Sequence, residues 1–219
     1  MRKPARLPLE ELRPYLVEAT PPGTPPEEVV RLPELDWRAV FGNAGPVELE
    51  VGFGKGLFLV TAGEANPGVN YLGVEIVRKY VLLTATRLAR RGFGNVKVAC
   101  ADARAFLAER VPDASLQAVH VYFPDPWWKA RHHKRRVFTD EFARQCQRAL
   151  RPGGRLLVAT DVEDYAALVR QTVAGQTALR ELPAPAERSP EHDLDYLTNF
   201  ERKFRRQGKP IWRLAYEKD

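Results

Sequence analysis

The chain has 219 residues, of which 44% are hydrophobic and 28% are charged, so it can bury one sizeable core but is short for two full domains. No run of about twenty apolar residues occurs, and the polar start Met1-Arg2-Lys3-Pro4 lacks an apolar signal core. From these features we expect a soluble protein that is not exported and that lies in the cytoplasm. Cys100 and Cys146 are too few for a disulfide scaffold and lack the paired spacing of a zinc site, so we expect no metal centre.

The first segment of the chain is rich in proline. Residues 1–46 are predicted to form an irregular arm with one short helix near Trp37, and residues 47–219 a single catalytic domain. The prolines that punctuate the arm are Pro4, Pro8, Pro14, Pro21, Pro22, Pro25, Pro26 and Pro33.

Buried strands and amphipathic helices alternate from Val47 onward. Apolar runs predict strands at 47–51, 71–76, 96–101, 118–123 and 155–159. Helical spacing appears between them, at 77–91 and at 138–150, where Pro152-Gly153-Gly154 closes the second helix. The pattern predicts a doubly wound, mostly parallel, Rossmann-like α/β sheet with ligands at the carboxyl ends of its strands. A last run at 211–216 follows a polar segment rather than a crossover helix, and predicts an antiparallel edge strand.

A glycine-rich turn follows the first of these strands. Glu50 is followed by Gly52, Gly54 and Gly56, whereas a dinucleotide site usually has the spacing G-x-G-x-x-G. A carboxylate at Glu50 would repel a pyrophosphate but suits a cationic ligand with an amino acid end. The turn resembles the S-adenosylmethionine loop of class I methyltransferases.

Two further acids lie where that resemblance expects them. Glu75, at the end of the second strand, can accept hydrogen bonds from both ribose hydroxyls, and Asp102, after the third, can accept from the adenine amino group. Each acid alone could equally be a helix N-cap or an exposed carboxylate. Three of them at successive strand ends favour a cofactor site.

The fourth strand ends in Phe123-Pro124-Asp125-Pro126-Trp127-Trp128-Lys129-Ala130. Prolines on both sides fix the backbone at Asp125, so we expect its carboxylate to lie beside the methyl group of the cofactor. A basic run follows at once, and aromatic rings next to cations suit base stacking and phosphate contacts. The run consists of Arg131, His132, His133, Lys134, Arg135 and Arg136.

This loop resembles that of the tRNA (guanine-N7)-methyltransferase family, whose signature is Phe-Pro-Asp-Pro-Trp, a lysine, and then Arg-His-His-Lys-Arg-Arg. The similarity extends from about Val47 to Glu217 and includes Thr160-Asp161 and the T-x-F-E motif at Thr198 to Glu201. It implies methyl transfer from S-adenosylmethionine to N7 of guanine 46 in the variable loop of tRNA. Trp128 and Ala130 depart from the proline and lysine common in the family, and the arm lacks the arginine- and glutamine-containing leader of many bacterial members.

The resemblance also implies roles for individual residues. Asp125 and the acids Glu50, Glu75 and Asp102 would serve the cofactor, and the basic run would hold the tRNA backbone. The guanine pocket would consist of Lys129, Asp161, Thr198, Asn199, Phe200 and Glu201. Because guanine N7 carries no proton, Asp125 would orient the base and offset its developing positive charge instead of acting as a general base.

Other functions remain open at this stage. An amino-group methyltransferase is one alternative, because Asp125-Pro126-Trp127 distantly resembles its Asp-Pro-Pro-Tyr loop; a catalytically inactive RNA-binding protein is another. The glycine spacing disfavours a nicotinamide oxidoreductase. The sequence does not distinguish a monomer from a homodimer.

Overall fold

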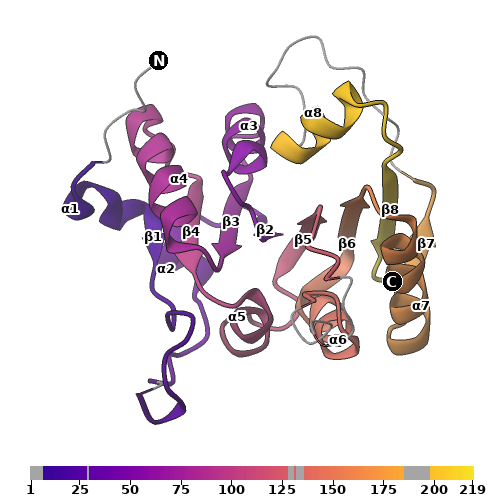
Figure 1. Ribbon diagram of the computed structural model, residues 1–219. Helices are drawn as coiled ribbons and strands as arrows, with labels where there is room; N and C mark the ends of the chain where they lie inside the picture. The colour runs from indigo at the N-terminus through magenta and orange to yellow at the C-terminus, as the bar shows by residue number, and fades with distance from the viewer. Residues whose placement is uncertain (1–6, 29, 128–130, 132–135, 185–197) are drawn as a thin grey trace.

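The computed structural model describes residues 7–28, 30–127, 131, 136–184 and 198–219. Its centre is one eight-stranded sheet with the order β1-β4-β3-β2-β5-β6-β8-β7 (Figure 1). Neighbouring strands among β1, β4, β3, β2, β5 and β6 pair in parallel. Strand β8 runs antiparallel to both of its neighbours, β6 and β7. The prediction of a doubly wound, mostly parallel sheet with an antiparallel last strand is therefore confirmed.

The predicted strands correspond to β2, β3, β4, β5, β6 and β8, whereas β1 and β7 were not predicted. The strand bounds are β1 Leu16–Val17, β2 Val47–Val51, β3 Asn70–Glu75, β4 Val96–Cys100, β5 Leu116–Tyr122, β6 Leu150–Thr160, β7 Arg180–Leu182 and β8 Trp212–Glu217. The helices are α1 Leu9–Leu12, α2 Trp37–Phe41, α3 Leu57–Ala65, α4 Arg78–Arg91, α5 Ala103–Arg110, α6 Asp140–Ala149, α7 Glu163–Gln176 and α8 Asn199–Arg206, with short 3-10 turns at Arg13–Tyr15 and Pro26–Glu28.

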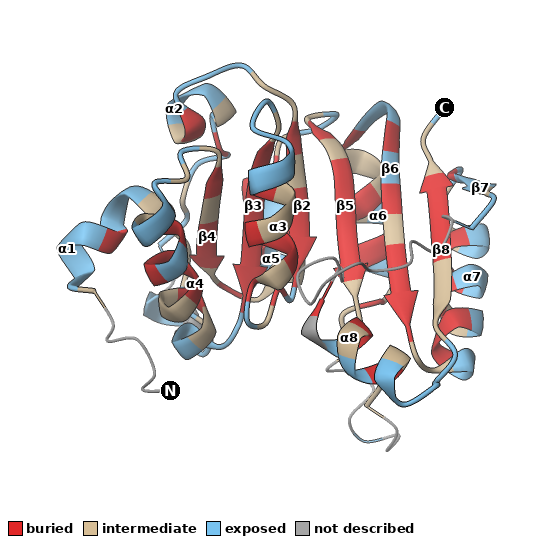
Figure 2. Ribbon diagram, turned by 90° about the horizontal axis from the view of Figure 1, so that it is seen from above, coloured by how far each residue is buried: buried red, intermediate tan, exposed pale blue. Residues whose placement is uncertain are grey.

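Hydrophobic packing occurs on both faces of the sheet, as expected when helices cover both sides. On one face, residues of α5, α6 and α7 such as Phe106, Phe142 and Val169 pack against Leu49 and Val119. On the other face, residues of α1, α3 and α4 pack against β3 and β4. Figure 2 shows the result, with the central strands buried and the outer faces of the helices exposed.

The proline-rich arm belongs to the sheet, which the sequence did not predict. Leu16 and Val17 pair in parallel with Val98 and Ala99 at the edge of β4. Arg110 of α5 fastens the arm further along, because its guanidinium donates to the carbonyls of Glu18 and Pro33 at 2.8 and 2.7 Å. The predicted short helix near Trp37 is α2, and its N-cap Asp36 accepts from the backbone N–H of Arg38.

Strand β6 begins earlier than predicted. Leu150 already pairs with Leu116, and the register then shifts before Ala118 pairs with Arg155. The Pro152-Gly153-Gly154 sequence, expected to end a helix, forms the irregular part of this strand. Only glycine fits at 154, since an added Cβ would lie 2.7 Å from the carbonyl oxygen of Arg151.

Candidate active site

The site-forming residues lie along the carboxyl edge of the sheet, on both sides of the point between β2 and β5 where the strand order reverses. Ligands of doubly wound sheets bind at such a switch point, beside the carboxyl ends of the strands. Glu50, Glu75, Asp102, Asp125 and Asp161 lie at or just after the ends of β2, β3, β4, β5 and β6, respectively. The acids predicted from the sequence thus share one edge of one sheet.

The glycine turn is built around backbone conformations that other residues rarely adopt. Gly52, Gly54 and Gly56 have φ values of 71°, 54° and 68°. A Cβ added at Gly52 or Gly54 meets no atom within 4 Å, so this side of the turn borders open space. At Gly56 an added Cβ would instead lie 2.5 Å from the Thr84 side chain, which ties the turn to α4.

Glu75 holds this turn in place. Its two carboxylate oxygens accept from the backbone N–H groups of Gly54 and Val77 at 2.9 and 2.8 Å. A carboxylate offers about four acceptor sites, so each oxygen keeps capacity for a ribose hydroxyl. Glu75 therefore holds the glycine turn in its conformation and can still accept hydrogen bonds from the ribose hydroxyls that the sequence predicts.

Glu50 is the most unusual acid of the site. Its side chain is 2% exposed, and Oε2 has no hydrogen-bond partner among the residues that the structure describes. Burial raises the pKa of Glu50 well above its ordinary value, and the charge of Glu75 raises it further. A buried carboxylate oxygen that the described residues leave without a hydrogen-bond partner is suited to a cationic ligand.

Asp102 has a structural role besides the predicted adenine contact. It is the N-cap of α5, and its carboxylate also accepts from the Arg104 guanidinium at 2.6 and 3.1 Å. The hydrogen bond from the Arg104 side chain is the largest cause that lowers the pKa of Asp102. Asp102 is therefore held ionised, and its contact with adenine stays a prediction.

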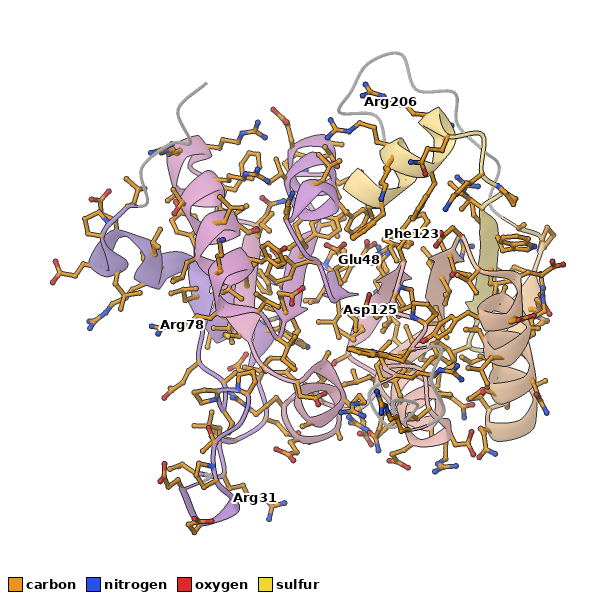
Figure 3. All side chains as sticks on the ribbon, viewed as in Figure 1. Arg31, Glu48, Arg78, Phe123, Asp125 and Arg206 are labelled. Atoms are coloured by element: carbon orange, nitrogen blue, oxygen red, sulfur yellow. The ribbon has the colours of Figure 1, made fainter. Side chains whose placement is uncertain are left out.

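The loop after β5 contains two strained residues. Phe123 and Trp127 have φ values of 52° and 45°, which are uncommon for bulky side chains and often occur at functional sites. The Arg136 Nε atom donates to the Pro126 carbonyl at 2.8 Å, and its guanidinium lies 6.0 Å from the Tyr165 ring centroid. Arg136 consequently braces the loop, and the side chain of Asp125 between its two prolines is exposed (Figure 3).

Parts of the predicted substrate site fall outside the described residues. These are Lys129, His132, His133, Lys134 and Arg135, together with Trp128 and Ala130. Arg131 is described and exposed.

The predicted guanine pocket includes the first turn of α8. Thr198 is the N-cap of this helix, and its hydroxyl accepts from the backbone N–H of Glu201 at 3.1 Å. Asn199 is the first helical residue, and Asp161, which follows β6, is half-buried. The side chain of Phe200 is 52% exposed beside Phe123 and Phe204, with ring centroids 6.4 and 6.2 Å away.

The carboxylate of Glu201 is directed into the protein. It is 2% exposed and accepts from Arg205 at 3.0 Å and from Arg213 of β8 at 2.5 Å. These contacts anchor α8 on the sheet, a role that the sequence did not reveal. The spacing of Thr198 and Glu201 is that of a capping box, which indicates where α8 begins but not the contacts with Arg205 and Arg213.

Phe123 and Arg136 are further site residues whose roles the sequence analysis missed. Both roles depend on contacts over long sequence separations, from Phe123 to Phe204 and from Arg136 to Tyr165. Neither contact follows from local spacing.

Comparison with protein families matches residues 44–214 to the model of a family described as "Putative methyltransferase". A tRNA (guanine-N(7)-)-methyltransferase from Rhodopirellula baltica is 46% identical over 190 residues, which cover 84% of this chain and 70% of the relative. The enzyme of the same name from Geobacter metallireducens is 40% identical over 84% of this chain and 87% of its own length.

Solved structures show the same fold at low sequence identity. The 16S rRNA methyltransferase KamB superposes with a TM-score of 0.61 at 18% identity, over 84% of this chain and 93% of KamB. The [4+2]-cyclase SpnF reaches a TM-score of 0.56 at 16% identity, over 80% of this chain and 76% of SpnF. Because a methyltransferase and a cyclase share this fold, the fold by itself does not define the reaction.

Proposed function

We propose that this chain, which belongs to the tRNA (guanine-N(7)-)-methyltransferase family, transfers a methyl group from S-adenosylmethionine to N7 of a guanine in tRNA. The main support for the proposal is the set of acids that lie at adjacent strand ends around the glycine turn. The relatives described above add the reaction and the substrate to this support. Guanine 46 of the variable loop is the nucleotide we propose. We also propose a cytoplasmic location, as expected for an enzyme that modifies tRNA. No helix of the described part of the chain is long and apolar enough to cross a membrane.

The residues present fit the methyl donor. Glu50 offers a buried carboxylate oxygen that no described residue hydrogen-bonds, Glu75 offers spare acceptor capacity, and the turn at Gly52 and Gly54 borders open space. Glu50 would bind the ammonium group of the cofactor, Glu75 its ribose and Asp102 its adenine. When bound, S-adenosylmethionine supplies an electrophilic methyl group on a sulfonium centre.

The acceptor atom determines what the protein must do. Guanine N7 already has a lone pair, so the site does not need a general base to create the nucleophile. We propose that Asp125 accepts from N1–H and the exocyclic amine, which orients N7 and offsets the positive charge that develops on the base. Positioning of this kind can supply effective molarities of about 10⁵ to 10⁸ M.

The reaction is tested with unfractionated tRNA that lacks the modification. The purified protein and S-adenosylmethionine should produce 7-methylguanosine, which is mapped by reduction and aniline cleavage at a single position. A methylated exocyclic amine would not cleave, and would identify an amino-group methyltransferase. A protein that binds tRNA but not S-adenosylmethionine in calorimetry would be an RNA-binding protein that retains the fold.

The basic run should supply tRNA affinity through phosphate contacts. Replacing Arg131 and Arg135 with glutamine should weaken tRNA binding and reduce the slope of log Kobs against log salt by about 2, near one unit per lost contact. Arg136 is left unchanged because it braces the Asp125 loop. Binding is measured by fluorescence anisotropy between low and high salt.

The matched control removes the same number of positive charges from another part of the surface. Arg170 and Arg180 are exposed on α7 and β7 and form ion pairs with Glu181 and Glu217. The Arg170→Gln/Arg180→Gln variant should keep the salt slope of the wild type. An equal flattening in both variants would show that overall charge, and not the basic run, attracts the tRNA.

A further inference from the structure

A continuous chain of hydrogen bonds crosses three strands under the proposed cofactor site. Arg151 of β6 donates to Gln117 Oε1 at 2.7 Å, and Gln117 Nε2 donates to Glu48 Oε1 at 2.8 Å. The other oxygen of Glu48 lies 2.9 Å from His120 Nε2, and His120 Nδ1 lies 2.8 Å from the Tyr122 hydroxyl. Glu48 and His120 have side chains only 14% and 5% exposed, so the contact between them is shielded from water, whereas Arg151 lies at the exposed end of the chain of hydrogen bonds.

The donors and acceptors of these hydrogen bonds have one consistent direction from Arg151 to Glu48. A guanidinium can only donate, so Gln117 presents its oxygen to Arg151 and its NH₂ group to Glu48. Burial alone would raise the pKa of Glu48, but hydrogen bonds from His120 and Gln117 together with neighbouring positive charge outweigh burial and lower the pKa. The ionised Glu48 therefore accepts from His120 Nε2–H.

The last link follows from the hydroxyl of Tyr122. Among the described residues, His120 Nδ1 is the hydrogen-bond partner of this hydroxyl. When the imidazole carries its single proton on Nε2, Nδ1 is bare and accepts the Tyr122 O–H. The remaining lone pairs of the Tyr122 oxygen face away from His120, so towards any other group this oxygen is an acceptor.

Tyr122 lies at the amino acid end of the proposed cofactor site. It ends β5, directly before the Asp125 loop, and its ring is 5.3 Å from that of Phe58 in the first turn of α3. Glu50 pairs with His120 in the parallel register, which places Glu48, Glu50, His120 and Tyr122 on one face of the sheet. Burial, and then the charge of Glu50, raise the pKa of Tyr122 well above its ordinary value and keep its hydroxyl protonated. Figure 3 shows Glu48 in the same region, between α3 and α8.

We propose that the chain from Glu48 through His120 fixes the Tyr122 hydroxyl oxygen as an acceptor beside the Glu50 carboxylate, and that the two oxygens together receive the ammonium group of the methyl donor. This inference rests on the proposed function. Tyr122 is then a cofactor-binding residue, and Glu48 and His120 are positioning residues that act through it.

The Glu48→Gln variant reverses the chain with little change in shape. Gln117 still donates to position 48, so the amide oxygen of the new side chain must face Gln117 and its NH₂ group must face His120. His120 Nε2 then has to accept, the ring proton moves to Nδ1, and the Tyr122 hydroxyl hydrogen turns toward the ligand. We expect the Kd for S-adenosylhomocysteine to rise about tenfold or more, the scale of a lost hydrogen bond to a charged group.

Methylthioadenosine is the control ligand because it has the adenine, ribose and sulfur of the cofactor but no ammonium group. Its Kd should stay within about twofold of the wild-type value in the Glu48→Gln variant, since its hydrogen bonds are unchanged. Glu217→Gln is the matched control variant: it makes the same replacement in an ion-paired strand residue of β8, away from the site. Calorimetry measures both ligands, and thermal melting checks that each variant is folded.

A double-mutant cycle with Tyr122→Phe distinguishes an effect transmitted through the hydrogen bonds from the effect of losing the negative charge of Glu48. If Glu48 acts through Tyr122, the effect of Glu48→Gln on S-adenosylhomocysteine binding should be at least about fivefold smaller when Tyr122→Phe is already present, beyond the additivity of independent sites. Tyr122→Phe removes one hydroxyl, so it gives the same ligand comparison should Glu48→Gln not fold. Additive effects of the two substitutions on S-adenosylhomocysteine binding, or an equal loss of affinity for methylthioadenosine, would overturn this inference but not the proposed function. A wild-type protein that binds neither ligand would overturn the proposed function, and the inference with it.

Discussion

The Asp125→Ala variant should lose methyl transfer to tRNA by at least about 10²- to 10³-fold in kcat, the effect typical of removing one preorganised stabilising group. Asp125 lies between two prolines on a loop that Arg136 braces, so its carboxylate stays in place while the base gains positive charge. Cofactor affinity should be nearly unchanged, because Glu50 and Glu75 lie on other strands. The loss should therefore appear in the chemical step.

Single-turnover methylation of tRNA and calorimetry with S-adenosylmethionine measure these two properties separately. Asp125→Asn keeps the shape of the side chain but removes the charge, and should recover only a small part of the rate. Asp113→Ala is the matched control, since this exposed aspartate lies before β5, at the opposite end of the strand from Asp125. Near wild-type turnover of Asp125→Ala on tRNA would contradict the orienting role.

The sheet and the acids at its edge were predictable because both depend on local patterns. A buried parallel strand is a continuous apolar run, and the residues directly after it must lie at the carboxyl edge of the sheet. Glu50, Glu75 and Asp102 were located in this way. Strand β1 was not, because Leu16 and Val17 become a strand only through their pairing with β4.

The periodicity of β2 and β5 also predicts polar side chains on one face of these buried strands. Val47, Leu49 and Val51 alternate with Glu48 and Glu50, and Val119 and Val121 alternate with His120 and Tyr122. Polar residues inside buried strands require partners. Which residues become those partners depends on the strand order, which brings β2 beside β5 after three crossover connections. The hydrogen-bond chain to Tyr122 is therefore visible only in the structure.

The Glu201→Ala variant should lose about 3 kcal/mol or more of stability, the cost of removing one partner from a buried charge pair. The carboxylate of Glu201 is almost fully buried, and two guanidinium groups, of Arg205 and Arg213, lose the acceptor that they share. A loss of 3 kcal/mol corresponds to a decrease of roughly 6–12 °C in Tm for a chain of this size. Helix α8 should detach from β8 first, because Arg213 is its ionic link to the sheet.

Two comparisons show whether Glu201 acts as an anchor or as a base contact. Thr198→Ala removes only the helix cap and should cost about 1 kcal/mol, so its Tm should lie between those of the wild type and Glu201→Ala. Glu141→Ala removes an exposed carboxylate bonded to Arg144 and should leave Tm unchanged. If Glu201 were chiefly a guanine contact, Glu201→Gln would raise the KM for tRNA while Tm stayed at the wild-type value. An anchor requires the opposite result: Tm falls, and KM for tRNA recovers at temperatures where α8 remains docked on the sheet.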